Sequence, residues 1–266
     1  MIENGFQYAQ PRLHARHGSR LDDGTWQQLL AIDSYALFLK HARQTALAPW
    51  LQNIGSQSDI YTIERVLREQ FRHYTMEVAS WLPVAWRPAT QWIGHLPDLP
   101  FVTYLAENPT VDGHLLLPWM REDRLLSILT QAEMPEGERG AKMGQTGLLL
   151  TLLFSVRAGK KVGSAWLSHW RSLWPESGPW SKPLEGLIAQ VERHVSVFGT
   201  LEKTSTAQAA RVELRRQLQL GFRRHTFQPA GVFIHLGLVA LELEMLRGGL
   251  AKRRLFNFGD ERETTP

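Results

Sequence analysis

The stretch FQPAGVFIHLGLVALELEMLRGGLAKRRLFNF, residues 227–258, decides the fold of this chain. Pro229 predicts the start of a helix, because its missing N–H is one of the donors that a first helical turn leaves unpaired. Apolar residues then recur at steps of three and four, and a second apolar strip lies on nearly the opposite side. The first stripe comprises Leu236, Val239, Leu243, Leu246 and Leu250, and the second Leu238, Leu241 and Met245. A helix with two apolar faces must be covered on both sides, so other helices must pack around it.

The second half of this predicted helix carries its charges. Glu242 and Glu244 lie between the two strips, and the basic run at 252–254 suits the negative end of a helix dipole. Glu244 and Arg247 stand three residues apart, close enough to pair on one helix. The spacing predicts a partly buried Glu244–Arg247 ion pair that fixes helix register; the alternative makes Arg247 part of a contact surface.

The rest of the chain has the periodicity of helices and no sustained period-two alternation, so the fold is predicted to be all-α. Prolines crowd residues 83–121, where short helices joined by turns are expected. We predict a multi-lobed helical bundle with an N-terminal lobe, a Pro-rich connection, a middle lobe and a C-terminal lobe, at residues 1–82, 83–121, 122–177 and 178–266. Helices are expected at residues 6–20, 22–32, from 34, 58–81, 122–132, 144–156, 162–174, 184–201 and 206–224.

The predicted helix at 162–174 carries tryptophans four residues apart on one face, namely Trp166, Trp170 and Trp174. The helix before it, residues 144–156, is apolar almost all round and is therefore expected to be buried. Packing of the tryptophans against that helix is the favoured interpretation. A partner-binding ridge is the alternative.

Composition limits the classes of function. The 266 residues are 43% hydrophobic and include no cysteine, so the chain can form a substantial core but no disulfide or thiolate site. The N-terminus lacks the basic-then-apolar order of a signal peptide, and the longest uncharged apolar runs are shorter than the roughly 18–20 residues of a membrane-spanning helix. We expect a cytoplasmic protein that does not span a membrane.

No catalytic, cofactor or metal site is predicted from spacing. The glycines and lysine at 137–144 lack the Gly-Lys-Ser/Thr ending of a phosphate loop. His14 and His17 could share a helical face, yet a zinc site needs a third ligand and supporting groups. His73, His225 and His235 are isolated, and each is interpreted as a hydrogen-bonded helix residue. A helical enzyme with an unrecognised site remains the least favoured hypothesis.

The C-terminal part is the most basic. The formal net charge of the whole chain is +4. Between Lys203 and Arg254 there are ten basic residues and three acidic ones. Four arginines on adjoining helical faces predict a positive strip, which comprises Arg215, Arg216, Arg223 and Arg224. A solvated face, an acidic protein partner and anionic lipid are all compatible with it. Nucleic acid is least favoured, because no aromatic residues alternate with the arginines as a stacking platform requires.

Both ends of the chain resemble one family. The C-terminal pattern of proline, apolar run, Glu-x-Glu, Leu-Arg and basic end is similar to that of the C/d-subunit family of A-type and V-type rotary ATPases. The N-terminal series is similar to the opening of that family, and residues 45–54 follow where the family has a Thr-x-Tyr-like segment; the series comprises Tyr8, Ala9, Arg12, Ala15, Arg16, Ser19 and Leu21. The resemblance covers about the first 55 and the last 50 residues. The chain is shorter than usual for the family, and Pro11 stands beside Arg12.

The resemblance implies a non-catalytic adaptor that links the membrane rotor ring to the central stalk and transmits torque for proton or sodium transport. Its expected partners are rotor-ring (c/K) and central-stalk subunits, without nucleic acid and with only indirect membrane contact at the inner face of the membrane. It implies a pseudo-threefold funnel and makes Arg12 and Arg16 structural or partner-facing residues. The alternative is a helical scaffold or regulatory subunit of a different membrane-associated complex.

Overall fold

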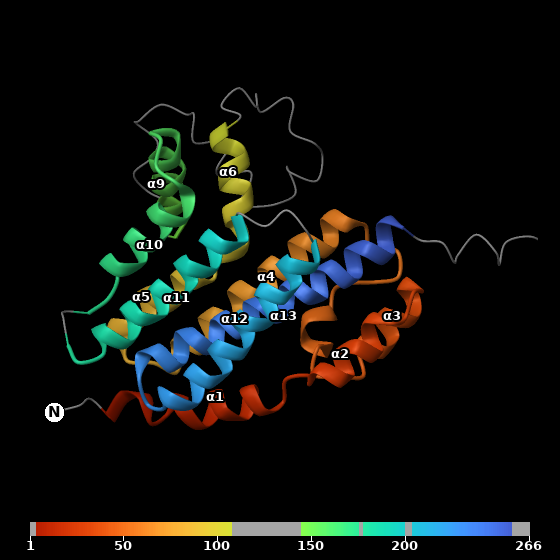
Figure 1. Cartoon of the computed structure of the whole chain (residues 1–266), viewed down its shortest axis with the longest axis horizontal. Coiled ribbons are helices and arrows are strands. Elements are labelled where there is room, and N and C mark those ends of the chain that lie inside the picture. Colours follow the sequence, from red (N-terminus) through yellow and green to blue (C-terminus); the bar gives the residue numbers. More distant parts are fainter. Residues whose placement is uncertain (1–3, 108–144, 176–177, 200–203, 257–266) are drawn as a thin grey trace, which may run out of the picture. The chain divides into compact units, whose positions relative to one another are not determined.

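The computed structural model describes residues 4–107, 145–175, 178–199 and 204–256, and every regular element in these ranges is helical (Figure 1). The prediction of an all-α chain is therefore confirmed. The chain divides into two compact units, one formed by Met1–Gly94 with Trp174–Pro266 and the other by His95–Leu173. Residues from both ends of the sequence thus build one unit. The pseudo-threefold funnel stays a prediction.

The first unit contains most of the helices. Its elements are the 3-10 helices η1 (Asn4–Phe6), η2 (Ala48–Leu51) and η3 (Val84–Trp86) and the α-helices α1 (Ala9–Gly18), α2 (Asp23–Leu30), α3 (Tyr35–Ala42), α4 (Ile60–Ser80), α5 (Arg87–Ile93), α11 (Ser181–Gly199), α12 (Thr204–Arg224) and α13 (Pro229–Leu255). In the ribbon of Figure 1, α13 runs between the helices of the N-terminal part and α12.

Side-chain caps start three of these helices where the sequence predicted them. The side chains of Asp22, Ser34 and Asp59 accept hydrogen bonds from backbone N–H groups of the first turns of α2, α3 and α4. Each cap satisfies a donor that the helix itself leaves unpaired. Pro11 lies in the first turn of α1, where its missing N–H does no harm.

Helix α13 is the core of this unit. Pro229 is its first residue after the N-cap Gln228, as predicted. It packs against α12, α4, α11, α3 and α1. The first apolar stripe is buried, whereas in the second strip Leu238 is buried and Leu241 and Met245 are half-buried. The prediction that both sides are covered is confirmed, with the first side covered more completely.

Within the described part of the chain, α13 is the one helix whose length and composition would let it cross a membrane. The sequence reasoning missed this, because Glu242 and Glu244 interrupt the apolar run. Of the most apolar 18-residue window, 72% is buried inside the structure, and the core helix of a soluble protein passes the same test.

The second unit contains η4 (Leu96–Asp98), α6 (Leu99–Glu107), α9 (Gln145–Arg157) and α10 (Val162–Ser172). Helix α9 packs against α6 and α10, and it buries Leu149, Leu152 and Leu153. The prediction that this helix is buried all round is wrong, because Phe154 is 46% exposed. Among the described residues of α9, the buried side chains lie on one side of the helix. The helix predicted at 122–132 lies outside the described residues.

The tryptophans of α10 lie in the core of the second unit. Trp166 and Trp170 are buried and stacked with their ring centroids 5.9 Å apart, and α10 packs against α9. The core-packing interpretation is confirmed for this pair. Trp174 lies beyond the end of α10 and contacts Trp180 at a centroid distance of 6.3 Å in the first unit.

Candidate functional site

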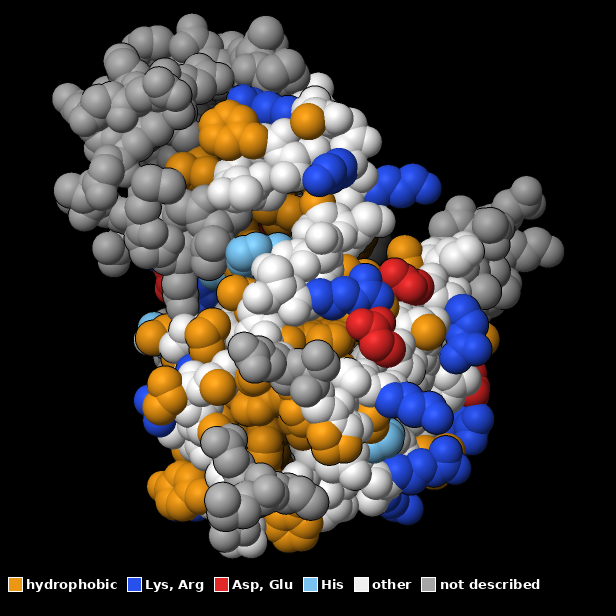
Figure 2. All heavy atoms as spheres, turned by 90° about the vertical axis from the view of Figure 1, so that its left-hand side faces the viewer, with side chains coloured by type: hydrophobic (Ala, Val, Ile, Leu, Met, Phe, Trp, Pro, Cys, Tyr) orange, Lys and Arg blue, Asp and Glu red, His pale blue; other side chains and the backbone are white. Residues whose placement is uncertain are grey.

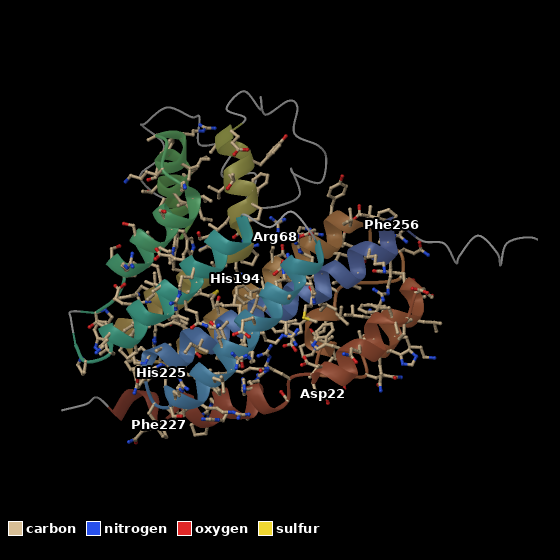
Figure 3. The ribbon with its side chains drawn as sticks, in the orientation of Figure 1. Asp22, Arg68, His194, His225, Phe227 and Phe256 are labelled. Carbon is tan, nitrogen blue, oxygen red and sulfur yellow. The ribbon has the colours of Figure 1, made fainter. Side chains whose placement is uncertain are left out.

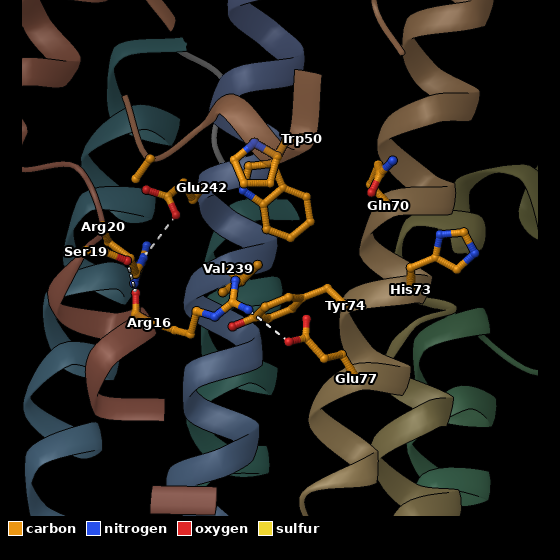
Figure 4. A pocket seen from close by; sticks show the side chains of 12 residues that line it. Arg16, Ser19, Arg20, Trp50, Gln70, His73, Tyr74, Glu77, Val239 and Glu242 are labelled. Atoms are coloured by element: carbon orange, nitrogen blue, oxygen red, sulfur yellow. Dashed lines mark hydrogen bonds and ion pairs between the residues drawn. The ribbon is translucent and has the colours of Figure 1, made fainter. Parts of the chain in front are cut away.

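A polar pocket opens between α1, α4 and α13 in the first unit (Figure 4). Its volume is about 180 Å³. The side chains that line it come from α1 and the residues after it, from the segment around η2, from α4 and from α13; they comprise Arg16, Ser19, Arg20, Ala46, Pro49, Trp50, Gln70, His73, Tyr74, Glu77, Val239 and Glu242. The pocket therefore lies where the N-terminal helices meet the central helix.

Two ion pairs border the pocket. The Nε of Arg20 donates to Oε2 of Glu242 at 3.1 Å, and these side chains are only 12% and 6% exposed. The same guanidinium donates from Nη2 to the backbone O of Leu238 at 2.9 Å. The second pair, Arg16 with Glu77 at 2.9 Å, lies in solvent. The buried pair joins residues at opposite ends of the sequence, whereas the exposed pair joins α1 to α4.

A histidine cluster lies beside the pocket. The OH of Tyr74 and Nε2 of His235 are 2.7 Å apart, and the His235 side chain is completely buried. The ring of His17 stacks on Phe222 at a centroid distance of 4.3 Å. Burial, together with the positive charge of Arg20, lowers the pKa of His17 to about 4 and that of His235 to about 3. Both rings are therefore neutral near pH 7.

Burial also raises the pKa of Tyr74, so its hydroxyl keeps its proton at neutral pH. Among the described residues, Oε1 of Glu242 and Nδ1 of His235 are buried without a hydrogen-bond partner. A buried polar atom left unpaired costs free energy, which makes this layer sensitive to substitution.

The geometry of the pocket suits the joining of helices better than acid–base chemistry. Its two arginines face its two glutamates, so the formal charges cancel and the carboxylates are held by guanidinium groups. His235 is enclosed and bonded to Tyr74. Within the described ranges, three or more His, Asp or Glu side chains do not come together in a group that could hold a metal ion.

The predicted Glu244–Arg247 ion pair is wrong. Glu244 pairs with Arg211 of α12 at 2.9 Å, and Arg247 pairs with Glu64 of α4 at 3.0 Å. The two side chains pair with different helices, because α12 and α4 flank α13 and each carries a side chain of opposite charge. Both pairs still fix the position of α13, but between helices and not along one.

The four arginines of the predicted positive strip lie in different environments. Arg215 is only 13% exposed and reaches from α12 to Asp23 of α2 at 2.7 Å. Arg216 lies in solvent and binds Glu213, whose pKa it lowers to about 2 by hydrogen bonding. Arg223 and Arg224 are exposed and, within the described part of the chain, have no ion-pair partner. Figure 3 labels His225 and Phe227, which follow them at the turn into α13.

The N-terminal site residues lie on the exposed side of α1. Arg12 lies over the ring of Tyr8 at 3.6 Å from its centroid and donates to the Tyr8 backbone O. Arg16 binds Glu77. These contacts are local or solvent-exposed, so neither arginine is held in the core.

The sequence reasoning missed Arg20, Tyr74 and Arg253. Arg253 belongs to the basic run expected to interact with the dipole of its own helix, yet it is 4% exposed and donates to the backbone O atoms of Leu29, Leu30 and Ile32, at the end of α2. It also donates to the O of Gly249 at 2.6 Å in its own helix. Only the tertiary fold brings α2 to this guanidinium, so no local spacing could have predicted it.

Comparison with known proteins gives no relative from which a role could be transferred, since no family model, curated protein or solved structure matches the chain.

Proposed function

We propose that this protein is a non-catalytic helical adaptor of the kind that its two ends resemble, the C/d-subunit family of rotary ATPases. In that role it would join rotor-ring subunits to central-stalk subunits at the inner face of the membrane and carry torque between them. Membrane contact would be indirect, and nucleic acid would have no part.

One observation carries the proposal: charged groups tie the central helix α13 to the helices around it. Glu242, Glu244 and Arg247 of α13 pair with Arg20 after α1, Arg211 of α12 and Glu64 of α4. At its C-terminal end, Arg253 binds the carbonyls that end α2. The buried Arg20–Glu242 pair and the buried Arg253 contacts resist sliding and rotation of α13 most, whereas the partly exposed pairs with Arg211 and Glu64 add less.

Such fixed helices are what a torque-bearing part requires. An adaptor that transmits force must move as one body, and a core of interdigitated side chains resists deformation. The polar pocket fits this role, since its two arginines form ion pairs with its two glutamates. A catalytic site would instead present groups that converge on a substrate.

Affinity purification from native membranes solubilised in mild detergent, followed by mass spectrometry, tests the proposal. We expect rotor-ring and central-stalk subunits to be recovered with the wild-type chain. The test variant is Arg20→Ala, in which the buried pair is broken; circular dichroism establishes that the variant is folded, and recovery of these subunits with it should fall. Recovery of a different membrane complex would assign the chain to the alternative, a scaffold or regulatory subunit, and would refute the rotary role.

A further inference from the structure

A groove with an apolar floor and a basic rim lies between α11, α12 and the start of α13. It has a volume of about 340 Å³ and is lined by residues of these three helices and of the turn before α13, which comprise Pro183, Gly186, Leu187, Gln190, Arg193, Gln217, Leu220, Gly221, Arg224, His225 and Ile234. Figure 2 shows the face of the molecule that lies at the left of Figure 1, on which hydrophobic side chains gather and Lys and Arg side chains lie toward one border.

The floor of the groove is apolar and recessed. Leu187 and Ile234 are 8% and 4% exposed, so they lie below the rim, and Leu220 is 39% exposed at the edge. Gly186 of α11 leaves open space, because a Cβ added there would meet nothing within 4 Å. Because the floor is recessed below the rim, projecting side chains of a partner can reach it and a flat surface cannot.

The rim offers hydrogen-bond donors and positive charge. Arg193 and Arg224 are exposed and, among the described residues, pair with no carboxylate. The lining residues include no Asp or Glu. An occupant must therefore supply carboxylates or other acceptors at the rim and apolar side chains at the floor.

We propose that this groove receives an amphipathic helix of a partner protein, with aliphatic residues facing Leu187 and Ile234 and acidic residues facing Arg193 and Arg224. An apolar helix face laid into a groove is a common mode of peptide recognition, and complementary charges at the rim set its orientation. A lipid surface is flat and would touch the arginines without reaching the floor. The assignment of this surface holds whichever complex the adaptor serves.

The test uses a fluorescein-labelled synthetic helical peptide with leucines on one face and glutamates beside them, and its affinity for the full chain is measured by fluorescence anisotropy. Arg193→Glu/Arg224→Glu reverses the rim charge, and Gly186→Leu places a leucine side chain in the groove lining without a backbone clash. Each should weaken peptide binding about tenfold or more. A peptide with lysine in place of glutamate should bind more weakly than the acidic one.

Two control variants match these changes outside the groove. Lys160→Glu/Lys182→Glu alters net charge equally, and Gly163→Leu adds the same side chain at another helical glycine with open space around it. Both should bind the acidic peptide within about twofold of wild type. Circular dichroism before and after the titration establishes that all chains are folded.

Three outcomes would overturn the assignment. The first is no binding of the acidic peptide, or equal affinity for wild type and the two groove variants. The second is groove-dependent binding to vesicles of phosphatidylcholine and phosphatidylglycerol without binding of the peptide, which would make the occupant a lipid headgroup. The third is a dimer in sedimentation velocity that Gly186→Leu abolishes, which would make it a second copy of this chain.

Discussion

Arg20 and Glu242 form a buried ion pair across 222 residues of sequence, with Nε and Oε2 3.1 Å apart. Oε1 of the same carboxylate has no partner in the described part of the chain. The guanidinium is thus the main compensation for a desolvated negative charge. It also fixes the end of the N-terminal helix α1 against α13, because its Nη2 binds the backbone O of Leu238.

Removal of one member of this pair should be costly. Arg20→Ala leaves Glu242 buried and uncompensated, and we expect a loss of about 3–5 kcal/mol in the free energy of unfolding, measured by urea denaturation. Arg20→Met/Glu242→Leu, which removes both charges, should recover most of this loss. The control is Arg16→Ala at the exposed pair with Glu77, which should cost less than about 1 kcal/mol. Equal losses at both pairs would contradict this account.

Acid should destabilise the first unit through its histidines. The pKa values of His17 and His235 in the folded chain, about 4 and about 3, lie below the ordinary value of 6.5. Between pH 6.5 and 4 the unfolded chain therefore binds protons that the folded chain does not, so stability is full above pH 6.5 and falls as the pH drops. For one completely buried histidine the slope approaches about 1.4 kcal/mol per pH unit.

Urea denaturation at pH steps from 7.5 to about 4.5 measures this slope. His235→Asn should flatten the profile, and His17→Asn should flatten it less because that ring is only half-buried. The window lies above the pKa that Asp59 and Glu213 have in the folded chain, since hydrogen bonds lower the pKa of both carboxyls there. A profile that is unchanged in His235→Asn would show that other groups govern acid unfolding.

The cap of α4 should contribute a measurable part of its stability. Oδ1 of Asp59 accepts from the backbone N–H of Thr62 at 2.8 Å. Asp59→Ala removes this acceptor and should lower the free energy of unfolding by about 1 kcal/mol in thermal or urea denaturation. Asp59→Asn keeps an acceptor oxygen and should lose less. If Asn were as costly as Ala, the charge and not the hydrogen bond would be responsible.

Two glycines should respond in opposite directions to alanine. Gly186 lies inside α11, where a Cβ would meet nothing within 4 Å, so Gly186→Ala should raise stability by about 0.5–1 kcal/mol. Gly231 lies in the first turn of α13, where a Cβ would overlap the carbonyl O of His225. Gly231→Ala should therefore destabilise despite its better helix propensity. Melting temperatures of the two variants decide this, and a gain in both would rule out the close contact.

The sequence could predict features that depend on neighbours in the chain. Asp22, Ser34 and Asp59 start helices because a capping side chain acts on N–H groups only two or three residues away. Pro229 begins α13 for an equally local reason. The two apolar strips of α13 likewise predicted that helices cover both of its sides, without showing which helices these are.

Features that depend on which helices meet could not be predicted in this way. Glu244 and Arg247 had the spacing of a local pair, but α12 and α4 bring Arg211 and Glu64 into better reach. An ion pair between exposed side chains of one helix stabilises it by only about 0.3–0.5 kcal/mol, so partners on neighbouring helices can readily replace it. Arg20 gave no signal in the sequence, because its partner is 222 residues away.

Arg253 offers a sharp test of how α13 is joined to α2. Its Nη2 donates to the O of Leu30 at 2.9 Å, its Nε donates to the O of Ile32, and its guanidinium lies 4.2 Å from the ring centroid of Phe38. These contacts satisfy carbonyls that the end of α2 leaves unpaired. Arg253→Lys keeps the charge but not the planar fork, so it cannot reach several carbonyls at once.

We therefore expect Arg253→Lys to cost about 1–3 kcal/mol in urea denaturation and Arg253→Met to cost more, since methionine donates no hydrogen bond to the carbonyls of Leu30 and Ile32. The matched control is Arg254→Lys on the adjacent residue, which is half-buried and lies 5.7 Å from the ring centroid of Tyr35. It should change stability by less than about 0.5 kcal/mol. Hydrogen exchange should localise the effect of Arg253→Lys to α2 and the end of α13, because only these segments share the lost bonds. Protection lost uniformly across the first unit would instead mean that the residue supports the whole core.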